Sequence, residues 1–230
     1  MYYQLETILS DLIRSGKLKP GDCIPTEAEL GDFFQLSRTT VRQAIMALVA
    51  EGKLYRLKGN GTYVSKPKIV QDFMRKLEPF SDQIERLGLT PSTKVLELSV
   101  VDPPADAVEI FNSTEKVICL KRLRFADKDP IVIVTTYLPM FCYFIMKNDM
   151  EKTGLYESLG LNNNTRVRTA TRQIEASIAG KYESELLEIA VGAPIQMTTT
   201  VGRNISGEPI ELSIAKYRGD KNKFIIELAI

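Results

Sequence analysis

A run of hydroxyl and guanidinium side chains, followed by a glycine-rich tip, is the part of this sequence best suited to bind a nucleic acid. The run 37–42 reads SRTTVR, and the tip 59–61 reads Gly-Asn-Gly. An arginine can donate two hydrogen bonds to guanine O6 and N7, and a threonine offers a hydroxyl to phosphate and a methyl group to thymine. A helix N-terminus adds free N–H groups and a partial positive charge. The pattern therefore predicts a helix that reads DNA and a turn that holds its backbone.

Arg122 and Arg124 form a second candidate site, because side chains two positions apart on a strand project from one face. Two guanidinium groups on one face require an anion, which neighbouring acids or a bound ligand could supply. Ser81 lies at the start of an expected helix, where backbone N–H groups point outward. Glu211 and Tyr217 lie on a later expected strand and could bind hydroxyl or amine groups of the same ligand. Surface ion pairing of the arginines is the alternative interpretation.

The residues that most enzymes and metal sites need are missing or scattered. There is no histidine, the commonest general base and zinc ligand. Cys23, Cys119 and Cys142 show no CxxC spacing, so we expect reduced thiols. We see no obvious carboxylate pair and no cysteine beside a base. We therefore expect no catalytic residue, no metal, no cofactor and no enzymatic activity.

Positive charge is concentrated in one segment of the chain. The 230 residues carry a net charge of +1, and 44% of them are hydrophobic, an ordinary value for a globular protein. Residues 38–68 alone carry a net charge of +6, whereas residues 1–37 carry −3. A local basic block is the electrostatic footprint of phosphate binding.

The uncharged run from Pro130 to Met146 is the only stretch that resembles a membrane segment. It is slightly short and Pro139 interrupts it, so we expect a buried strand followed by a new element. No signal peptide is visible, and we expect a cytoplasmic protein.

Three helices must position the DNA-reading residues. Apolar residues at helical spacing predict a first helix that Gly16 ends. Thr26 and Glu29 form a capping-box pattern that opens a second helix. The residues that we expect this helix to bury are Leu30, Phe33 and Phe34. Ser37 caps a third helix, which ends at Gly52 and buries one apolar face.

Two short strands, 54–57 and 62–65, are expected around the glycine-rich tip. The order of helix, helix, helix, strand, tip and strand is that of a winged helix-turn-helix. We assign residues 1–66 to this DNA-binding domain and residues 67–78, which are polar and contain Pro67, to a linker.

The remainder, residues 79–230, has a different pattern. We expect helices over 81–87 and 181–190. Strand-like runs lie near 94–101, 116–125, 131–138, 168–178, 195–203, 209–217 and 223–228. Since strands dominate and short turns join them, this domain is predicted to be α+β with a mixed, mostly antiparallel sheet.

Residues 2–65 resemble the N-terminal domain of GntR-family bacterial transcription regulators. The matching segments read YYQLETILSDLIRSGKLKPGDCIPTEAELGDFF and SRTTVRQAIMALVAEGKLYRLKGNGTYV. The resemblance implies that DNA contacts fall on Arg38, Thr39, Thr40, Arg42, Lys58, Gly59, Asn60 and Gly61. Ala28 departs from the pattern, because some relatives carry there an arginine that reaches DNA, and we assign no contact to it.

Residues 79–230 resemble the effector-binding UTRA domain of the HutC-type subgroup, which is similar in fold to chorismate lyase. The matching segments include PFSDQIERLGLTPS, KRLRFADKDPIVIVTTYLP and GLYESLG, and a longer match covers 185–224. The resemblance implies an effector site formed by Ser81, Arg122, Arg124, Tyr156, Glu211 and Tyr217. Two positions depart from sugar-phosphate-sensing relatives: Val134 stands where a glutamate is frequent, and Gly154 where a serine is common. The first change removes an acceptor for amino or hydroxyl groups.

A ligand-responsive repressor is the function that these features predict. It would bind a pseudo-palindromic double-stranded operator as a homodimer, because one recognition helix reads too few base pairs. A small anionic effector, most readily a sugar phosphate, would release it from the operator or re-set its DNA binding. Two alternatives remain at this point: a lyase-like enzyme carrying a DNA-binding head, and a constitutive, structural DNA-binding protein.

Overall fold

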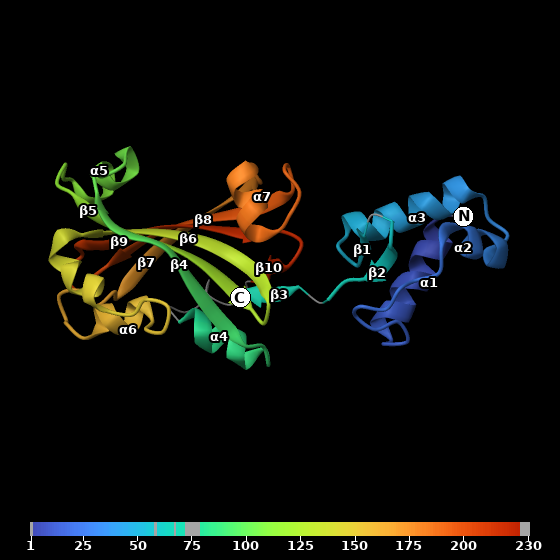
Figure 1. Ribbon diagram of the computed structural model, residues 1–230, viewed down its shortest axis with the longest axis horizontal. Coiled ribbons are helices and arrows are strands. Elements are labelled where there is room, and N and C mark those ends of the chain that lie inside the picture. The colour runs from blue at the N-terminus through green and yellow to red at the C-terminus, as the bar shows by residue number, and fades with distance from the viewer. Residues whose placement is uncertain (1, 58, 67, 72–78, 226–230) are drawn as a thin grey trace, which may run out of the picture. The chain divides into compact units, whose positions relative to one another are not determined.

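The computed structural model describes residues 2–57, 59–66, 68–71 and 79–225. They form two compact units that divide between Lys68 and Ile69, and each is described by itself. Figure 1 labels the helices and strands of both. Within the described ranges, no helix is both long and apolar enough to cross a membrane. Cys23 is exposed, Cys119 and Cys142 are buried, and all three are free thiols.

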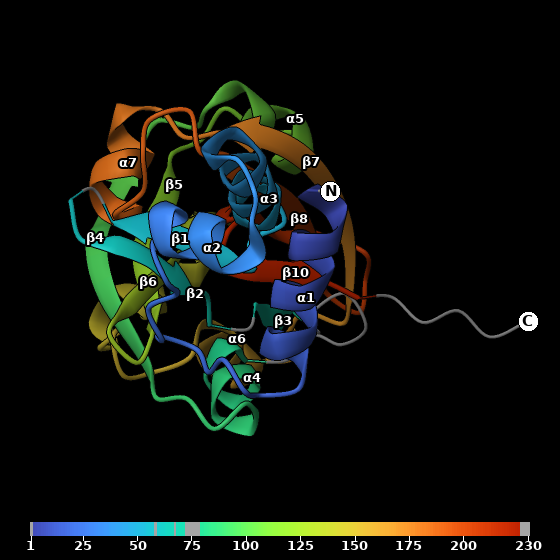
Figure 2. The same ribbon diagram turned by 90° about the vertical axis from the view of Figure 1, so that its right-hand side faces the viewer.

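The N-terminal unit is a winged helix-turn-helix, as the sequence predicts. Its elements are α1 (Tyr2–Arg14), α2 (Glu27–Phe34), α3 (Arg38–Ala50), β1 (Leu54–Leu57) and β2 (Gly61–Val64); Figure 2 shows them turned by 90°. Its core buries Leu5, Leu9, Ile24, Leu30, Val41, Ala44, Ile45, Leu48, Leu54 and Val64. The apolar faces of three helices and of the hairpin thus meet in one core.

Side-chain caps begin the second and third helices. Glu29 N donates to Thr26 Oγ1 at 3.3 Å, and Thr26 N donates to Glu29 Oε2 at 2.8 Å, which completes the expected capping box. Thr40 N donates to Ser37 Oγ at 3.2 Å at the start of α3. Each cap satisfies backbone donors that a helix leaves unpaired at its first turn.

The expected burial of Phe33 is wrong. Its side chain is 80% exposed, whereas Leu30 is buried and Phe34 is partly buried against the core. Residues four apart lie on the same face of a helix, so Leu30 and Phe34 share the core-facing side. Phe33 points away from it, with its ring in edge contact with that of Phe34.

The C-terminal unit is built on a six-stranded antiparallel sheet with the strand order β4-β5-β6-β9-β8-β7. The strands are β4 (Pro91–Val101), β5 (Val117–Ala126), β6 (Asp129–Pro139), β7 (Thr169–Ile178), β8 (Pro194–Arg203) and β9 (Pro209–Arg218). The helices are α4 (Phe80–Arg86), α5 (Ala105–Phe111), the 3-10 helix η1 (Met140–Lys147), α6 (Leu155–Gly160) and α7 (Lys181–Leu187). The α+β prediction is confirmed, with α4 and α6 on one face of the sheet and α5 and α7 on the other (Figure 1).

A short parallel pair joins the two ends of this unit. β3 (Ile69–Gln71) pairs with β10 (Asn222–Phe224), and Ile69 lies opposite Asn222. Residues 69–71 were expected in the linker, but they form a strand. Positions 226–228 of the last expected strand lie outside the described residues.

Candidate functional site

The exposed face of α3 carries the side chains expected to contact DNA. Arg38, Thr39 and Arg42 are exposed. Thr40 is half-buried, and its hydroxyl lies 2.8 Å from Ser37 Oγ, so it shares in the helix cap. The opposite face of the same helix is in the core, which leaves the guanidinium groups free to approach a groove.

The wing presents its tip to solvent. Gly59, Asn60 and Gly61 are exposed, with φ angles of 78° at Gly59 and 120° at Gly61. A side chain at Gly61 would be strained at that φ, and its Cβ would lie 3.1 Å from Cys23 Sγ, so glycine is required there. Lys58, the remaining wing residue predicted to bind DNA, lies outside the described residues.

Contacts within the unit hold the wing in place. Arg56 on β1 forms a 2.5 Å ion pair with Glu27 in the first turn of α2. The rings of Tyr55 and Tyr63 stack at a centroid distance of 5.6 Å, and the Tyr63 hydroxyl donates to Asn60 O at 2.8 Å. The tip is therefore anchored both to its own strands and to the second helix.

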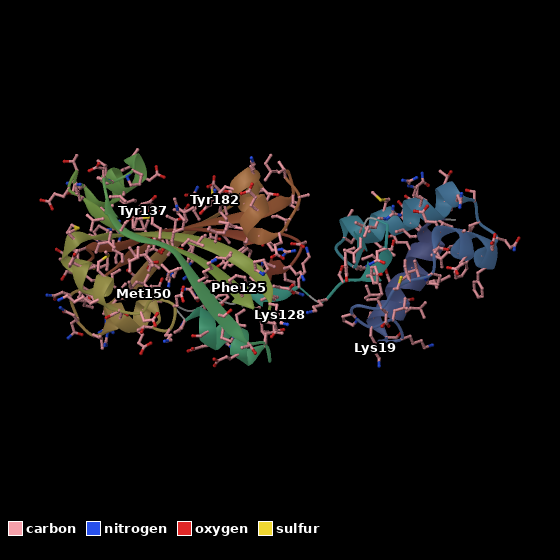
Figure 3. The ribbon with its side chains drawn as sticks, viewed as in Figure 1. Lys19, Phe125, Lys128, Tyr137, Met150 and Tyr182 are labelled. Atoms are coloured by element: carbon pink, nitrogen blue, oxygen red, sulfur yellow. The ribbon has the colours of Figure 1, made fainter. Side chains whose placement is uncertain are left out.

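All six residues expected in the effector site line one pocket of about 460 Å³ in the C-terminal unit. They come from α4 (Ser81), β5 (Arg122, Arg124), α6 (Tyr156) and β9 (Glu211, Tyr217). The two departures, Val134 and Gly154, line it too. Figure 3 shows Met150, another lining residue, on one side of the sheet and Tyr137 and Tyr182 on the other. The volume lies in the range of about 300–1,000 Å³ usual for small-molecule sites.

The two arginines are held in the pocket rather than on the protein surface. Arg122 is 3% exposed, and the Nε atoms of Arg122 and Arg124 are buried with no hydrogen-bond partner among the described residues. Burial, followed by the charge of Arg124, lowers the pKa of Arg122 well below its ordinary value. The Arg124 guanidinium lies 4.9 Å from the centre of the Phe80 ring. Surface ion pairing of the arginines is therefore wrong.

A buried carboxylate faces these cations. Glu211 is 4% exposed and accepts a 2.5 Å hydrogen bond from Ser213 Oγ, which in turn lies 2.7 Å from Thr136 Oγ1. Burial raises the pKa of Glu211, and hydrogen bonds from Ser213 and Tyr156 oppose that rise. Burial also raises the pKa of Tyr217 to about 12, so its hydroxyl is a neutral donor. The buried part of the pocket thus offers charged donors, neutral hydroxyls and the acidic acceptor Glu211.

The mouth of the pocket is more exposed than its floor. Ser81, in the first turn of α4, is exposed and its Oγ lies 3.1 Å from Asp82 Oδ1. Tyr156 in α6 is half-buried, and Gly154 is the N-cap residue of that helix. These residues lie above the sheet, where they can contact a ligand that rests on the floor.

Family comparison decides the identity of both units. The model of the gntR family of bacterial regulatory proteins matches residues 1–64, and the model of the UTRA domain matches residues 86–223. The chain belongs to the GntR family and carries a UTRA domain. It is a DNA-binding transcription regulator of the HutC subgroup and not an enzyme. The effector is bound by the UTRA domain.

Curated relatives and a solved structure agree with this assignment. The chain is 30% identical over 227 residues to the HTH-type transcriptional repressor NagR of Bacillus subtilis, covering 98% of this chain and 93% of that protein. It is 26% identical to the mannosyl-D-glycerate transport/metabolism system repressor MngR of Escherichia coli, covering 98% and 95%. The crystal structure of PhnF from Mycobacterium smegmatis has the same fold, with a TM-score of 0.68 at 22% identity over 99% and 98% of the two chains.

Several residues that line the pocket of the UTRA domain were not predicted from the sequence. Phe80, Arg172, Thr198 and Thr200 all face the same pocket. Their strands were expected, but strand order and register decide which residues meet, and neither can be read from one sequence. The alternation of Thr198 and Thr200 on β8 was the available signal, since it places both on one face.

Proposed function

We propose that this regulator is a repressor that binds a pseudo-palindromic operator as a homodimer and is released by a small anionic metabolite, most readily a sugar phosphate. The relatives NagR and MngR carry the word repressor in their names, which supports that sign of regulation. The cytoplasmic location expected from the sequence belongs to the same proposal.

Unpaired charge in the pocket supports an anionic effector. The arginines Arg122, Arg124 and Arg172 line it, and Glu211 is the acidic residue buried in its floor. Two buried guanidinium Nε atoms without a partner in the described chain are the observation that carries the proposal. A buried donor without a partner costs about 1–3 kcal/mol, a cost that a bound phosphate would remove. The charged residues that line the pocket are four cations and three acids, a net charge of +1, which also favours an anionic ligand: Arg122, Arg124, Lys152 and Arg172 against Glu85, Glu151 and Glu211.

The DNA interface that we propose comprises α3 and the wing. Arg38, Thr39, Thr40 and Arg42 would enter the major groove, and Lys58, Gly59, Asn60 and Gly61 would hold the neighbouring backbone. Two copies on a palindrome would place their half-sites one helical turn apart, about 10 base pairs, or a multiple of it. The dimer doubles the number of base pairs that are read.

Release of selected DNA tests the proposal. Duplexes selected by the purified full chain from a random pool would be titrated with a panel of sugar phosphates, with binding followed by fluorescence anisotropy. The double variant Arg122→Ala with Arg124→Ala should keep its DNA affinity and lose release by the phosphate. Arg168→Ala, an exposed arginine outside the pocket, is the matched control. Normal release from the double variant would show that the anion site is assigned wrongly.

A further inference from the structure

The core of the DNA-binding unit reaches the base of the wing and not its outer half. Leu54 at the start of β1 and Val64 at the end of β2 are buried, whereas the next three residues of β1 lie outside the core. A two-stranded hairpin is marginally stable by itself. Contacts beyond the core must therefore fix the direction in which the tip of the wing points.

Backbone hydrogen bonds fix one strand of the wing. Gly21 N donates to Val64 O, and Ile24 N donates to Thr62 O, both at 2.9 Å. Val64 N in turn donates to Asp22 O at 2.9 Å. These bonds join β2 to the segment that leads into α2.

An ion pair joins the other strand of the wing to α2. Arg56 Nη2 lies 2.5 Å from Glu27 Oε1, although the two residues are 29 positions apart in the chain. Arg56 lies two positions after the buried Leu54, and alternate residues of a strand share a face, so its side chain projects toward the helices. Glu27 follows Thr26, the N-cap of α2. The two strands are thus fastened on either side of one helix cap.

This ion pair is too exposed to add much to the stability of the unit. The side chains of Arg56 and Glu27 are 32% and 30% exposed, and ion pairs near the surface contribute little to folding. The pair also neutralises one cation of the basic segment 38–68, where phosphate binding gains from each positive charge. The geometry that the pair imposes on the wing explains such a contact better than stability or charge does.

We propose that Glu27 and Arg56 are positioning residues that set the angle between the wing and α3. Their ion pair holds β1 against the start of α2, so that the tip, residues 59–61, and α3 contact one duplex at the same time. Neither Glu27 nor Arg56 has to touch DNA. This inference rests on the DNA contacts of α3 and the wing proposed above, and it adds the residues that align them.

Removal of Glu27 separates alignment from simple electrostatics. Glu27→Ala takes away a negative charge beside a surface that binds phosphate, so electrostatics alone would tighten DNA binding. Loss of alignment should instead weaken the binding of the full chain to its selected duplex by about 3- to 10-fold. Asp32→Ala, the same charge change at an exposed residue of α2, is the matched control and should not weaken binding. Fluorescence anisotropy measures the three affinities.

Footprinting identifies the contacts that are lost. In Glu27→Ala, protection of the sugars under the wing from hydroxyl radicals should fall, whereas protection of major-groove bases from methylation should persist. The exchange variant Glu27→Arg with Arg56→Glu restores the pair in reverse, so its affinity should return to within about 3-fold of wild type. Urea unfolding of each variant checks that the unit is folded.

Three results would overturn the inference. The first is binding by Glu27→Ala that equals or exceeds that of wild type. The second is an exchange variant that binds no more tightly than Glu27→Ala, which would indicate that Arg56 itself contacts phosphate. The third is loss of major-groove protection together with wing protection, which would indicate a distorted unit. If wild type protects no sugar under the wing, the proposed wing contact is wrong and this inference with it, whereas the assignment of α3 stands.

Discussion

At the scale of single residues, the buried arginine Arg122 is a cost that the ligand-free protein carries. Burial and the like charge of Arg124 both lower its pKa, which means that the charged form is destabilised in the folded state. Glu211 acts in the opposite direction and offsets part of that cost. Residues that oppose stability in this way are typical of binding sites, where the ligand completes the interaction.

Replacement of Arg122 by an uncharged residue should therefore abolish ligand binding and stabilise the ligand-free protein. Arg122→Met keeps the length of the side chain and removes the charge, so the ligand-free protein should gain about 0.5–2 kcal/mol in unfolding free energy. The sign follows from linkage: a base with a lowered folded pKa binds its proton more weakly when folded, so its charged form disfavours folding. Urea unfolding at neutral pH measures the change.

Thermal stabilisation by a phosphate ligand is the second measurement on the Arg122→Met variant. The variant should show no thermal stabilisation by a sugar phosphate that stabilises wild type. Arg168→Met, on an exposed arginine, should change neither quantity. A less stable Arg122→Met protein would contradict this prediction. It would show that Arg122 stabilises the ligand-free protein through its contacts with Glu211.

Base recognition by the DNA-binding domain is expected to depend on the single residue Arg38. Its side chain is exposed in the first turn of α3. If it donates two hydrogen bonds to a guanine, Arg38→Ala should cost about 1–3 kcal/mol on the selected operator and relax the preference at one base pair. Selection from random duplexes by the variant measures that relaxation. An unchanged selected sequence would remove the assignment of Arg38 to base recognition.

At the scale of elements, the start of α2 depends on one threonine. The Thr26 hydroxyl accepts from Glu29 N, and the Glu29 carboxylate accepts from Thr26 N. Thr26→Ala removes the first bond, so the free energy of opening the first turn of α2 should fall by about 0.5–2 kcal/mol. Amide exchange in α2 should therefore become about 2- to 30-fold faster. Hydrogen–deuterium exchange on the full chain measures this change. Thr7→Ala, inside α1, should leave exchange in α2 unaltered.

Elements with strong local signals were predictable, and weaker ones were not. The caps at Thr26 and Ser37 mark helix starts in any context, and the strand-like runs near 116–125 and 131–138 mark strands regardless of their partners. The helices α5 and α6 have seven and six residues and were not expected, whereas α4 and α7, with seven residues each, were. Phe33 was misplaced because the short α2 buries only a narrow stripe.

Several residues that line the pocket could be predicted from the sequence, but the strand register that brings the lining residues together could not. Arg122 and Arg124 stand out because two cations on one strand face are unusual, and family resemblance supplied Tyr156 and Glu211. Arg172 lies on an edge strand whose partner is 28 residues distant, so only register brings it to Thr200. Register depends on the packing of whole faces, which a single sequence does not display.

At the scale of the whole molecule, the effector site exists only when the C-terminal unit is folded. Its lining runs from α4 to β9, so no short segment contains it. A ligand at 100 times its Kd should therefore raise the unfolding free energy of this unit by about 2.7 kcal/mol. The slowest amides of β5, β6, β8 and β9 should exchange about 100-fold more slowly, together. The Arg122→Ala, Arg124→Ala variant should show no such slowing, and protection confined to one strand would contradict a shared site.

Alternate residues of the strands in the central sheet form two different surfaces, one on each face. Arg122 and Arg124 face the pocket, while Leu123 between them packs with Ile133 and Ile195 against α7 on the reverse side. Substitutions at the residues that face the pocket can thus change which metabolite the protein binds and leave the opposite face of the sheet intact. A lineage of such regulators could acquire new chemical preferences without having to reinvent the scaffold that carries them.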